Sequence, residues 1–171
     1  MKKLILMGLF TLLCIGSKAQ GSLEVSGSPY YYEDVIREDS ISAHDLYSKG
    51  LEWFANTFND SKAVIQIQDP VGLVIVGKGK SLSNKNSFGA RYYVDYTVKL
   101  EFKDGKVRYS LYDFSSEYYG TIKDGKITKY QIFLGHGEMN RIYKNLQLEC
   151  GNVNDVLSTT LRQGLKKSIN W

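Results

Sequence analysis

The two histidines are the first side chains to examine for chemistry, because imidazole changes its charge near neutral pH. His136 lies in the segment "GHGE", flanked by glycines, with Glu138 two residues later. A general base oriented by a carboxylate can be built in this way. The sequence contains no Gly-x-Ser-x-Gly elbow and no partnered cysteine to supply a nucleophile. We therefore predict that His136 is a loop residue without function; an unrecognised hydrolase-like enzyme using His136 is an alternative.

A second lead is the segment "GKGKS" (77–81), which follows an apolar run. A phosphate-binding loop needs a glycine five positions before its Gly-Lys-Ser triplet, and that position is Val74. The segment is instead typical of a strand end with solvated lysines. No histidine and carboxylate cluster has the spacing of metal ligands. The sequence therefore predicts neither a metal nor a cofactor.

The N-terminus is typical of an export signal. Two lysines precede an apolar run from Leu4 to Ile15, which is shorter than the ~20 residues that span a bilayer. Ser17 and Ala19 occupy the −3 and −1 positions of a signal-peptidase site, so we expect cleavage between Ala19 and Gln20. Residues 1–19 are thus predicted to be a signal peptide and 20–29 a flexible lead. A retained anchor and lipidation of Cys14 are the alternatives.

The charge of the chain belongs largely to this signal. Residues 1–19 carry three lysines and no acidic residue, so removing them lowers the formal charge from +4 to +1. A nearly neutral chain lacks the charge expected of a protein that binds a phosphate backbone. We expect no nucleic-acid partner and no stable membrane insertion after cleavage. The remaining cysteine, Cys150, cannot form an internal disulfide, so one hydrophobic core must stabilise residues 30–171 as a single domain.

The segment 40–58 has helical periodicity. Ser42 and Asp45 resemble a capping box. A core-facing stripe recurs at i, i+4, i+7 and i+11, and it consists of Tyr47, Leu51, Phe54 and Phe58. At ~100° per residue, Trp53 points about 130° away from this stripe, close to Leu46. Leu46 and Trp53 therefore form a second apolar stripe, which we predict is covered by residues 115–152, by the N-terminal lead or by another molecule.

Several runs predict strands. They are 30–39, 63–69 and 73–81, and the clearest is the hairpin 91–114. Asp104-Gly105 is a two-residue turn signal that sets Phe102 opposite Val107. The same register sets Leu100 opposite Tyr109, Val98 opposite Leu111, and Glu101 opposite Arg108. A second hairpin is expected near 118–134 around a repeated "KDGK", and a short strand at 143–149. The chain ends in a predicted helix with Asn154 as its N-cap.

This order of elements, together with three segments, resembles a known family. The segments are "LYSKGLEWFANTFNDSKAVIQIQD", "IVGKG" and "KDGKVRYSLYDF". They are similar to the secreted bacterial domain family of unknown function with a TBP-like fold, over residues 30–114 and, by position only, the final helix. The resemblance implies an α+β fold of helix-grip type. A bent antiparallel sheet, β-α-β-β-β-β with an extra hairpin region at about 115–152, would pack against two helices. The family brings no catalytic residues.

The expected function is a non-enzymatic extracytoplasmic binding or interaction domain. Seven of the thirteen tyrosines lie between 92 and 119, and two of them fall on the predicted inner sheet face. One hypothesis is an apolar or amphipathic ligand held between the sheet and the C-terminal helix. Simple core packing is the other interpretation of these residues. The predicted contacts are Tyr96, Val98, Leu100 and Tyr109 in the sheet, and Leu157, Leu161 and Leu165 in the helix. An alternative is a protein-contact module using the Leu46 and Trp53 face.

Overall fold

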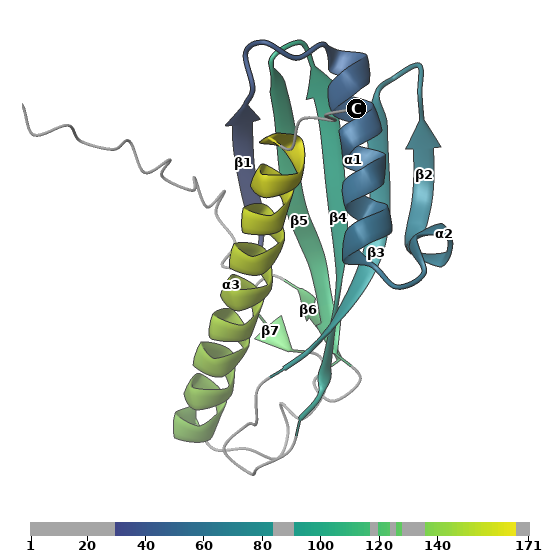
Figure 1. The fold of residues 1–171 in the computed structure, drawn as a ribbon. Coiled ribbons are helices and arrows are strands. Elements are labelled where there is room, and N and C mark those ends of the chain that lie inside the picture. The colour runs from purple at the N-terminus through teal and green to yellow at the C-terminus, as the bar shows by residue number, and fades with distance from the viewer. Residues whose placement is uncertain (1–29, 84–90, 117–119, 124–125, 128–135, 167–171) are drawn as a thin grey trace, which may run out of the picture.

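The computed structural model describes residues 30–83, 91–116, 120–123, 126–127 and 136–166. These residues form one antiparallel sheet with helices on one of its faces (Figure 1). The chain therefore has the predicted α+β architecture. In order, its elements are β1 (Tyr32–Arg37), α1 (Ala43–Thr57), α2 (Ser61–Val64), β2 (Ile65–Asp69), β3 (Val74–Leu82), β4 (Tyr93–Lys103), β5 (Lys106–Ser116), β6 (Gly120–Lys123), β7 (Lys126–Ile127) and α3 (His136–Lys166).

The strand order is β2-β3-β4-β5-β6-β7, and β1 also pairs with β5. β1 pairs with Lys106–Leu111, whereas β6 pairs with Ser115 and Ser116. These two strands therefore share one edge of β5, one after the other. The pair β6 and β7 lies within the range predicted for the second hairpin, 118–134, whose other residues are outside the described part of the chain.

The predicted β4–β5 hairpin is confirmed in register. Phe102 is paired with Val107, Leu100 with Tyr109 and Val98 with Leu111. Gly105 in the turn has φ 70°, a left-handed conformation that glycine adopts without steric cost. On the other face Arg108 and Glu101 form the predicted cross-strand ion pair, with 3.8 Å between Nη1 and Oε2.

Helix α1 begins as its sequence predicts. The Ser42 hydroxyl oxygen accepts a hydrogen bond from the backbone N–H of Asp45 at 3.2 Å. The same hydroxyl donates to the Asp45 carboxylate at 2.7 Å. Tyr47 and Phe54 are buried against the sheet, and Phe58 stacks on Phe54 with ring centroids 5.4 Å apart.

The C-terminal region differs from its prediction. One helix of 31 residues, α3, replaces both the short strand predicted at 143–149 and the helix predicted to begin at Asn154. Asn154 is an interior position of this helix and is 1% exposed. An apolar stripe explains the result, because buried side chains recur every three or four residues along α3. They are Ile142, Leu146, Cys150, Val153, Leu157, Leu161 and Leu165.

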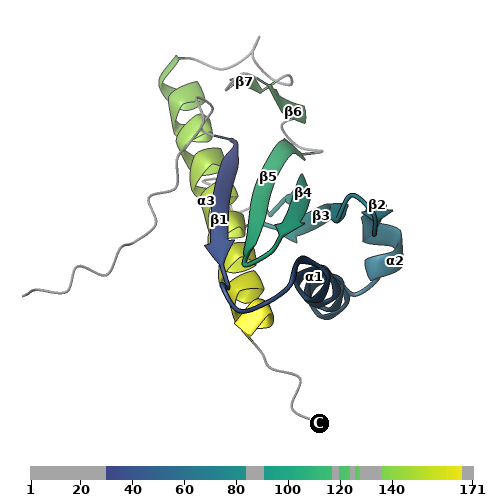
Figure 2. The same cartoon turned by 90° about the horizontal axis from the view of Figure 1, so that it is seen from above.

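Helices α1 and α3 lie side by side on the same face of the sheet, here called the inner face (Figures 1 and 2). An ion pair between Arg162 of α3 and Asp34 joins the helix to β1. Aromatic and aliphatic side chains from both helices and from β3, β4 and β5 form one buried cluster. The opposite face of the sheet, the outer face, is covered by no helix in the described part of the chain.

The glycines of "GKGKS" face inward from β3 and make room for two aromatic rings. A Cβ atom on Gly77 would lie 2.5 Å from the Phe54 ring, and one on Gly79 would lie 2.3 Å from the Tyr96 ring. Tyr96 is directly opposite Gly79 in the sheet. The two glycines of this segment therefore allow close packing of the core, and the segment is not a nucleotide-binding loop.

We expect Gly79→Ala to lower the free energy of unfolding by about 1–3 kcal/mol, the usual cost of overpacking. The ring of Tyr96 is rigid and buried, so it cannot turn aside cheaply. Urea unfolding followed by circular dichroism measures the loss. Lys78→Ala, on the exposed outer side of the same strand, is the matched control. Equal stability of the two variants would contradict the close packing described for Gly79.

Candidate functional site

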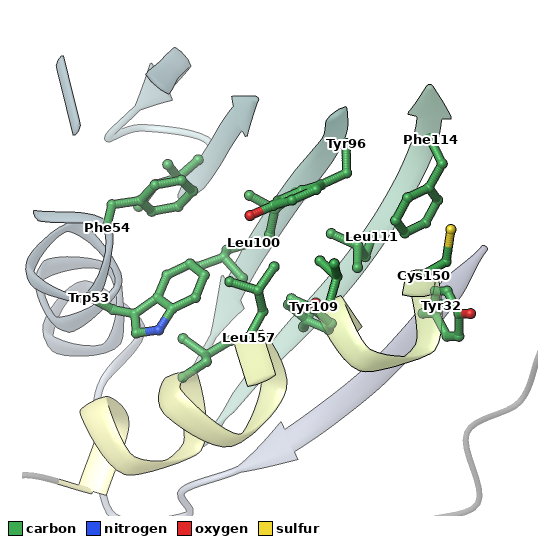
Figure 3. Packing of buried hydrophobic residues seen from close by; sticks show 14 of the residues in the cluster. Tyr32, Trp53, Phe54, Tyr96, Leu100, Tyr109, Leu111, Phe114, Cys150 and Leu157 are labelled. Atoms are coloured by element: carbon green, nitrogen blue, oxygen red, sulfur yellow. The ribbon is translucent and has the colours of Figure 1, made fainter. Parts of the chain in front are cut away.

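The seven residues predicted to hold a ligand lie together, as the sequence places them. Tyr96, Val98, Leu100 and Tyr109 form part of the inner sheet face, and the three leucines of α3 pack over it. Figure 3 shows Leu157 of α3 beside the Trp53 ring of α1, Tyr109 close to α3, and Tyr96 farther away on the sheet. Each of the seven is at most 5% exposed. These side chains fill the space between sheet and helix with one another, and their role in ligand binding stays a prediction.

Three hollows on the described surface are lined by other residues. One lies on the outer face near the β4–β5 turn, one beside β2, and one between α1 and α3. None of the seven predicted ligand contacts lines any of them. Among the described residues, neither the buried Tyr109 hydroxyl nor the buried Asn154 Oδ1 atom has a hydrogen-bond partner. Burial raises the pKa of Tyr109, and the nearby Tyr96 adds to the effect.

The prediction of a partner-contact face at Leu46 and Trp53 is wrong for this chain. Leu46 is 0% and Trp53 3% exposed. Helix α3 covers the indole, whose Nε1 donates a hydrogen bond to the Thr160 hydroxyl at 3.1 Å. Gly164 lets the two helices approach, since a Cβ there would lie 3.4 Å from the Trp53 ring. The second apolar stripe of α1 is therefore part of the contact between α1 and α3.

The two histidines lie in the first turns of two different helices, α1 and α3. The backbone of His136 begins α3 instead of lying in a loop, and the side chains of His136 and Glu138 are outside the described residues. His44 is exposed in the first turn of α1. Among the described side chains there is no group of histidine, cysteine or carboxylate residues that could hold a metal ion. Of the described helices, none is long and apolar enough to cross a membrane.

The outer face of the sheet carries the surface features that sequence reasoning missed. Lys80 pairs with Asp95 at 3.4 Å and lies 5.3 Å from the centre of the Tyr93 ring. Tyr93 is 48% exposed. Farther across the face, the rings of Tyr31 and Tyr112 are 6.3 Å apart. Tyrosine and charged side chains on a rigid sheet are suited to contact a ligand with both apolar and polar groups.

A hollow of about 270 Å³ lies on this face near the β4–β5 turn. We call it the cationic hollow, because four of its six lining residues are basic. The six are Val35, Arg37, Glu101, Lys103, Lys106 and Arg108. The hairpin register already places Glu101 beside Arg108. The sequence gives no signal that β1 pairs with β5, so the contribution of Val35 and Arg37 was not predictable.

The sequence model of a domain of unknown function (DUF4468) with TBP-like fold matches residues 32–117. The chain belongs to this family. The match spans β1 to β5 and α1 to α2, so it includes every residue of the cationic hollow, whereas α3 lies beyond it. The TBP-like fold implied by the sequence motifs is thereby confirmed for this DUF4468 chain.

Solved structures show the same fold. A DUF4468 family protein from Bacteroides ovatus matches with a TM-score of 0.60 and 14% sequence identity, covering 89% of this chain and 95% of that one. A TBP-like protein from Parabacteroides distasonis matches with a TM-score of 0.55 and 12% identity, covering 77% of this chain and 92% of that one. A comparison with curated proteins finds no match. At such low sequence identities, the structural similarity supports the fold of this DUF4468 chain but does not assign it a role.

Proposed function

We propose that this chain is an exported, non-enzymatic binding domain that contacts a small molecule through the outer face of its sheet. One observation carries the proposal. Both long helices lie on the inner face (Figure 2). The outer face exposes tyrosines, arginines and lysines in fixed positions. Residues on strands are held more firmly than residues on loops, which favours a preorganised surface.

The outer face supports binding better than the predicted interior does. An apolar ligand between sheet and α3 would displace Leu157, Leu161 and Leu165 from their buried positions. Each leucine contributes roughly 1.5–3 kcal/mol through burial, so displacing them opposes binding. The outer face needs no such rearrangement. A protein partner on the same face is the second candidate, whereas we propose no nucleic-acid partner, because the chain without its first 19 residues is nearly neutral.

Two parts of the proposal, export and a non-enzymatic role, are supported by the sequence alone. The charged start, the short apolar run and the small residues Ser17 and Ala19 favour removal of residues 1–19. The sequence supplies no nucleophile with a partnered base. We expect protein recovered from its native host to have the intact mass of a chain that begins at Gln20. A mass that retains residues 1–19 would contradict the export proposal.

The test is a nuclear magnetic resonance titration of the chain from Gln20, labelled with nitrogen-15. The added sample is the low-molecular-weight fraction of the host's exported compartment. We expect saturable shifts at outer-face amides such as Tyr93, Lys99 and Arg108. An unfractionated protein extract from the same compartment, added separately, tests a partner protein at the same amides.

Three results would overturn the proposal in different ways. Shifts concentrated at Tyr96, Tyr109 and Leu157 would place the ligand in the interior. Conversion of a compound in the added fraction would show catalysis. Unchanged spectra after both additions would remove the outer face as a binding surface.

A further inference from the structure

Three cationic side chains form one row across three strands of the outer face. Arg37 of β1 is directly opposite Lys106 of β5, and Lys106 is directly opposite Lys103 of β4. All three line the cationic hollow, so they lie on the same side of the sheet. Like charges directly opposite each other destabilise a sheet. The fold therefore keeps an arrangement that costs stability in the free chain.

Within the described residues, no carboxylate forms an ion pair with a member of this row. Arg37, Lys103 and Lys106 make no ion pair there. Glu101 is the acidic residue among those lining the hollow, and its oxygens already contact Lys99 at 3.1 Å and Arg108 at 3.8 Å. The neighbouring Asp104 carboxylate accepts a hydrogen bond from the backbone N–H of Ala43 at 2.8 Å.

The hollow has the charge and size for a compact anion. Its lining carries four basic residues and one acidic residue, which gives a formal charge of +3. Its volume of about 270 Å³ lies just below the ~300–1,000 Å³ of ordinary ligand pockets. Val35 is 41% exposed and supplies an apolar wall. Arg37 and Arg108 add planar guanidinium groups, which bind oxyanions through two parallel hydrogen bonds.

We propose that the cationic hollow binds the phosphate or sulfate group of a small soluble molecule. A phosphate group with up to two negative charges offsets the row better than a carboxylate with one. A sulfate group attached to a molecule carries one charge but has the same tetrahedral arrangement of oxygens. This inference rests on the proposed function, because it places the ligand on the outer face. It adds the chemical class of the ligand and the residues that hold its anionic group.

The test uses the chain from Gln20 and inorganic pyrophosphate as the probe, with ionic strength held constant by sodium chloride. We expect saturable amide shifts at Arg37, Lys103, Lys106 and Arg108. The variant combining Arg37→Gln with Lys106→Gln should bind pyrophosphate at least tenfold more weakly. Lys78→Gln, at an exposed position on the same face but outside the hollow, should bind as the unmodified chain does.

Stability provides a second readout that a merely structural role of these residues would not produce. Removing the opposed charges should leave the double variant at least as stable to urea as the unmodified chain, despite its weaker binding. Pyrophosphate should also raise the urea midpoint of the unmodified chain but not that of the double variant.

Several outcomes would overturn the inference. One is an absence of saturable shifts with pyrophosphate, phosphate and sulfate. Another is an equal loss of affinity in Lys78→Gln, and a third is binding only to vesicles that contain an anionic phospholipid. If the compartment fraction shifts the Tyr93 end of the face while pyrophosphate shifts nothing, the inference fails and the proposed function stands. If neither addition shifts the outer face, both fail.

Discussion

Trp53→Ala is expected to lower the free energy of unfolding by about 3–5 kcal/mol, as for other buried aromatic residues cut to alanine. The indole is enclosed by both long helices. Its ring lies edge-on to Phe54 and Phe58, with centroids 5.0 and 5.9 Å away. Its Nε1 donates to Thr160 of α3 at 3.1 Å. The substitution therefore leaves a cavity and removes a link between α1 and α3, and a loss of this size is a large part of a domain's usual stability.

The measurement is urea unfolding of the unmodified chain and three variants, followed by circular dichroism. Trp53→Phe keeps most of the apolar volume and should cost less than Trp53→Ala. Thr160→Val removes the hydrogen-bond acceptor and leaves a buried N–H unpaired, with an expected cost of about 1–3 kcal/mol. Val156→Ala, at an exposed position of α3, is the control. A Trp53→Ala loss below about 1 kcal/mol would mean that Trp53 is not enclosed by α3 in solution.

Helical periodicity could not predict which part of the chain buries Trp53. The angle between Trp53 and the main stripe of α1 correctly predicted that this helix has two apolar stripes. Periodicity describes one helix at a time, so it could not say that a helix more than a hundred residues later would cover the second stripe. The contact depends on the small residue Gly164 and on Thr160, and neither has a distinctive signal of its own in the sequence.

Helix α3 shows how local signals can mislead. Gly151, Asn152 and Asn154 are weak helix formers, and Asn154 followed by Asp155 resembles a helix start. The apolar spacing from Ile142 to Leu165 points instead to one continuous helix. Burial of this stripe against the sheet outweighs the local preferences, because tertiary packing provides most helical stability in proteins.

The β4–β5 hairpin could be predicted for the opposite reason. The β4–β5 turn, the alternation of apolar residues and the opposed charges all agree, and each is local in sequence. The pairing of β1 with β5 joins segments about seventy residues apart and has no local signal. The cationic hollow depends on that pairing, since it brings Arg37 beside Lys106. Sequence reasoning therefore drew attention to the tyrosine-rich inner face, whose side chains are used in packing.

Raising the pH from 9 to 12 is expected to unfold the domain cooperatively. Desolvation on burial raises the pKa of the Cys150 thiol from 9.0 to about 12 and that of Tyr96 from 10.0 to about 12. Desolvation also raises the pKa of Tyr109, whose hydroxyl has no hydrogen-bond partner in the described part of the chain. The folded chain therefore holds these protons more tightly than the unfolded chain does.

The sign of the effect follows from that difference. Below about pH 9 all three groups are protonated in both states, so their contribution to stability is complete. Above pH 9 for Cys150, and above pH 10 for the tyrosines, the unfolded chain loses protons that the folded chain keeps. Each group then lowers the free energy of unfolding by roughly 1.4 kcal/mol per pH unit until its folded-state pKa is reached. Three groups together can remove the stability of an ordinary domain within about two units.

Tyrosinate absorbance and circular dichroism, recorded on the same samples, measure this transition. We expect the absorbance of the buried tyrosines to rise together with the loss of secondary structure. Cys150→Ala should remove the decline that begins near pH 9, because it deletes the group with the lowest unfolded-state pKa. Tyr109→Phe should reduce the loss above pH 10 and remove an unpaired buried hydroxyl. If every tyrosine titrates near pH 10 while the dichroism stays native, the tyrosines are solvated and the sheet and α3 do not enclose them.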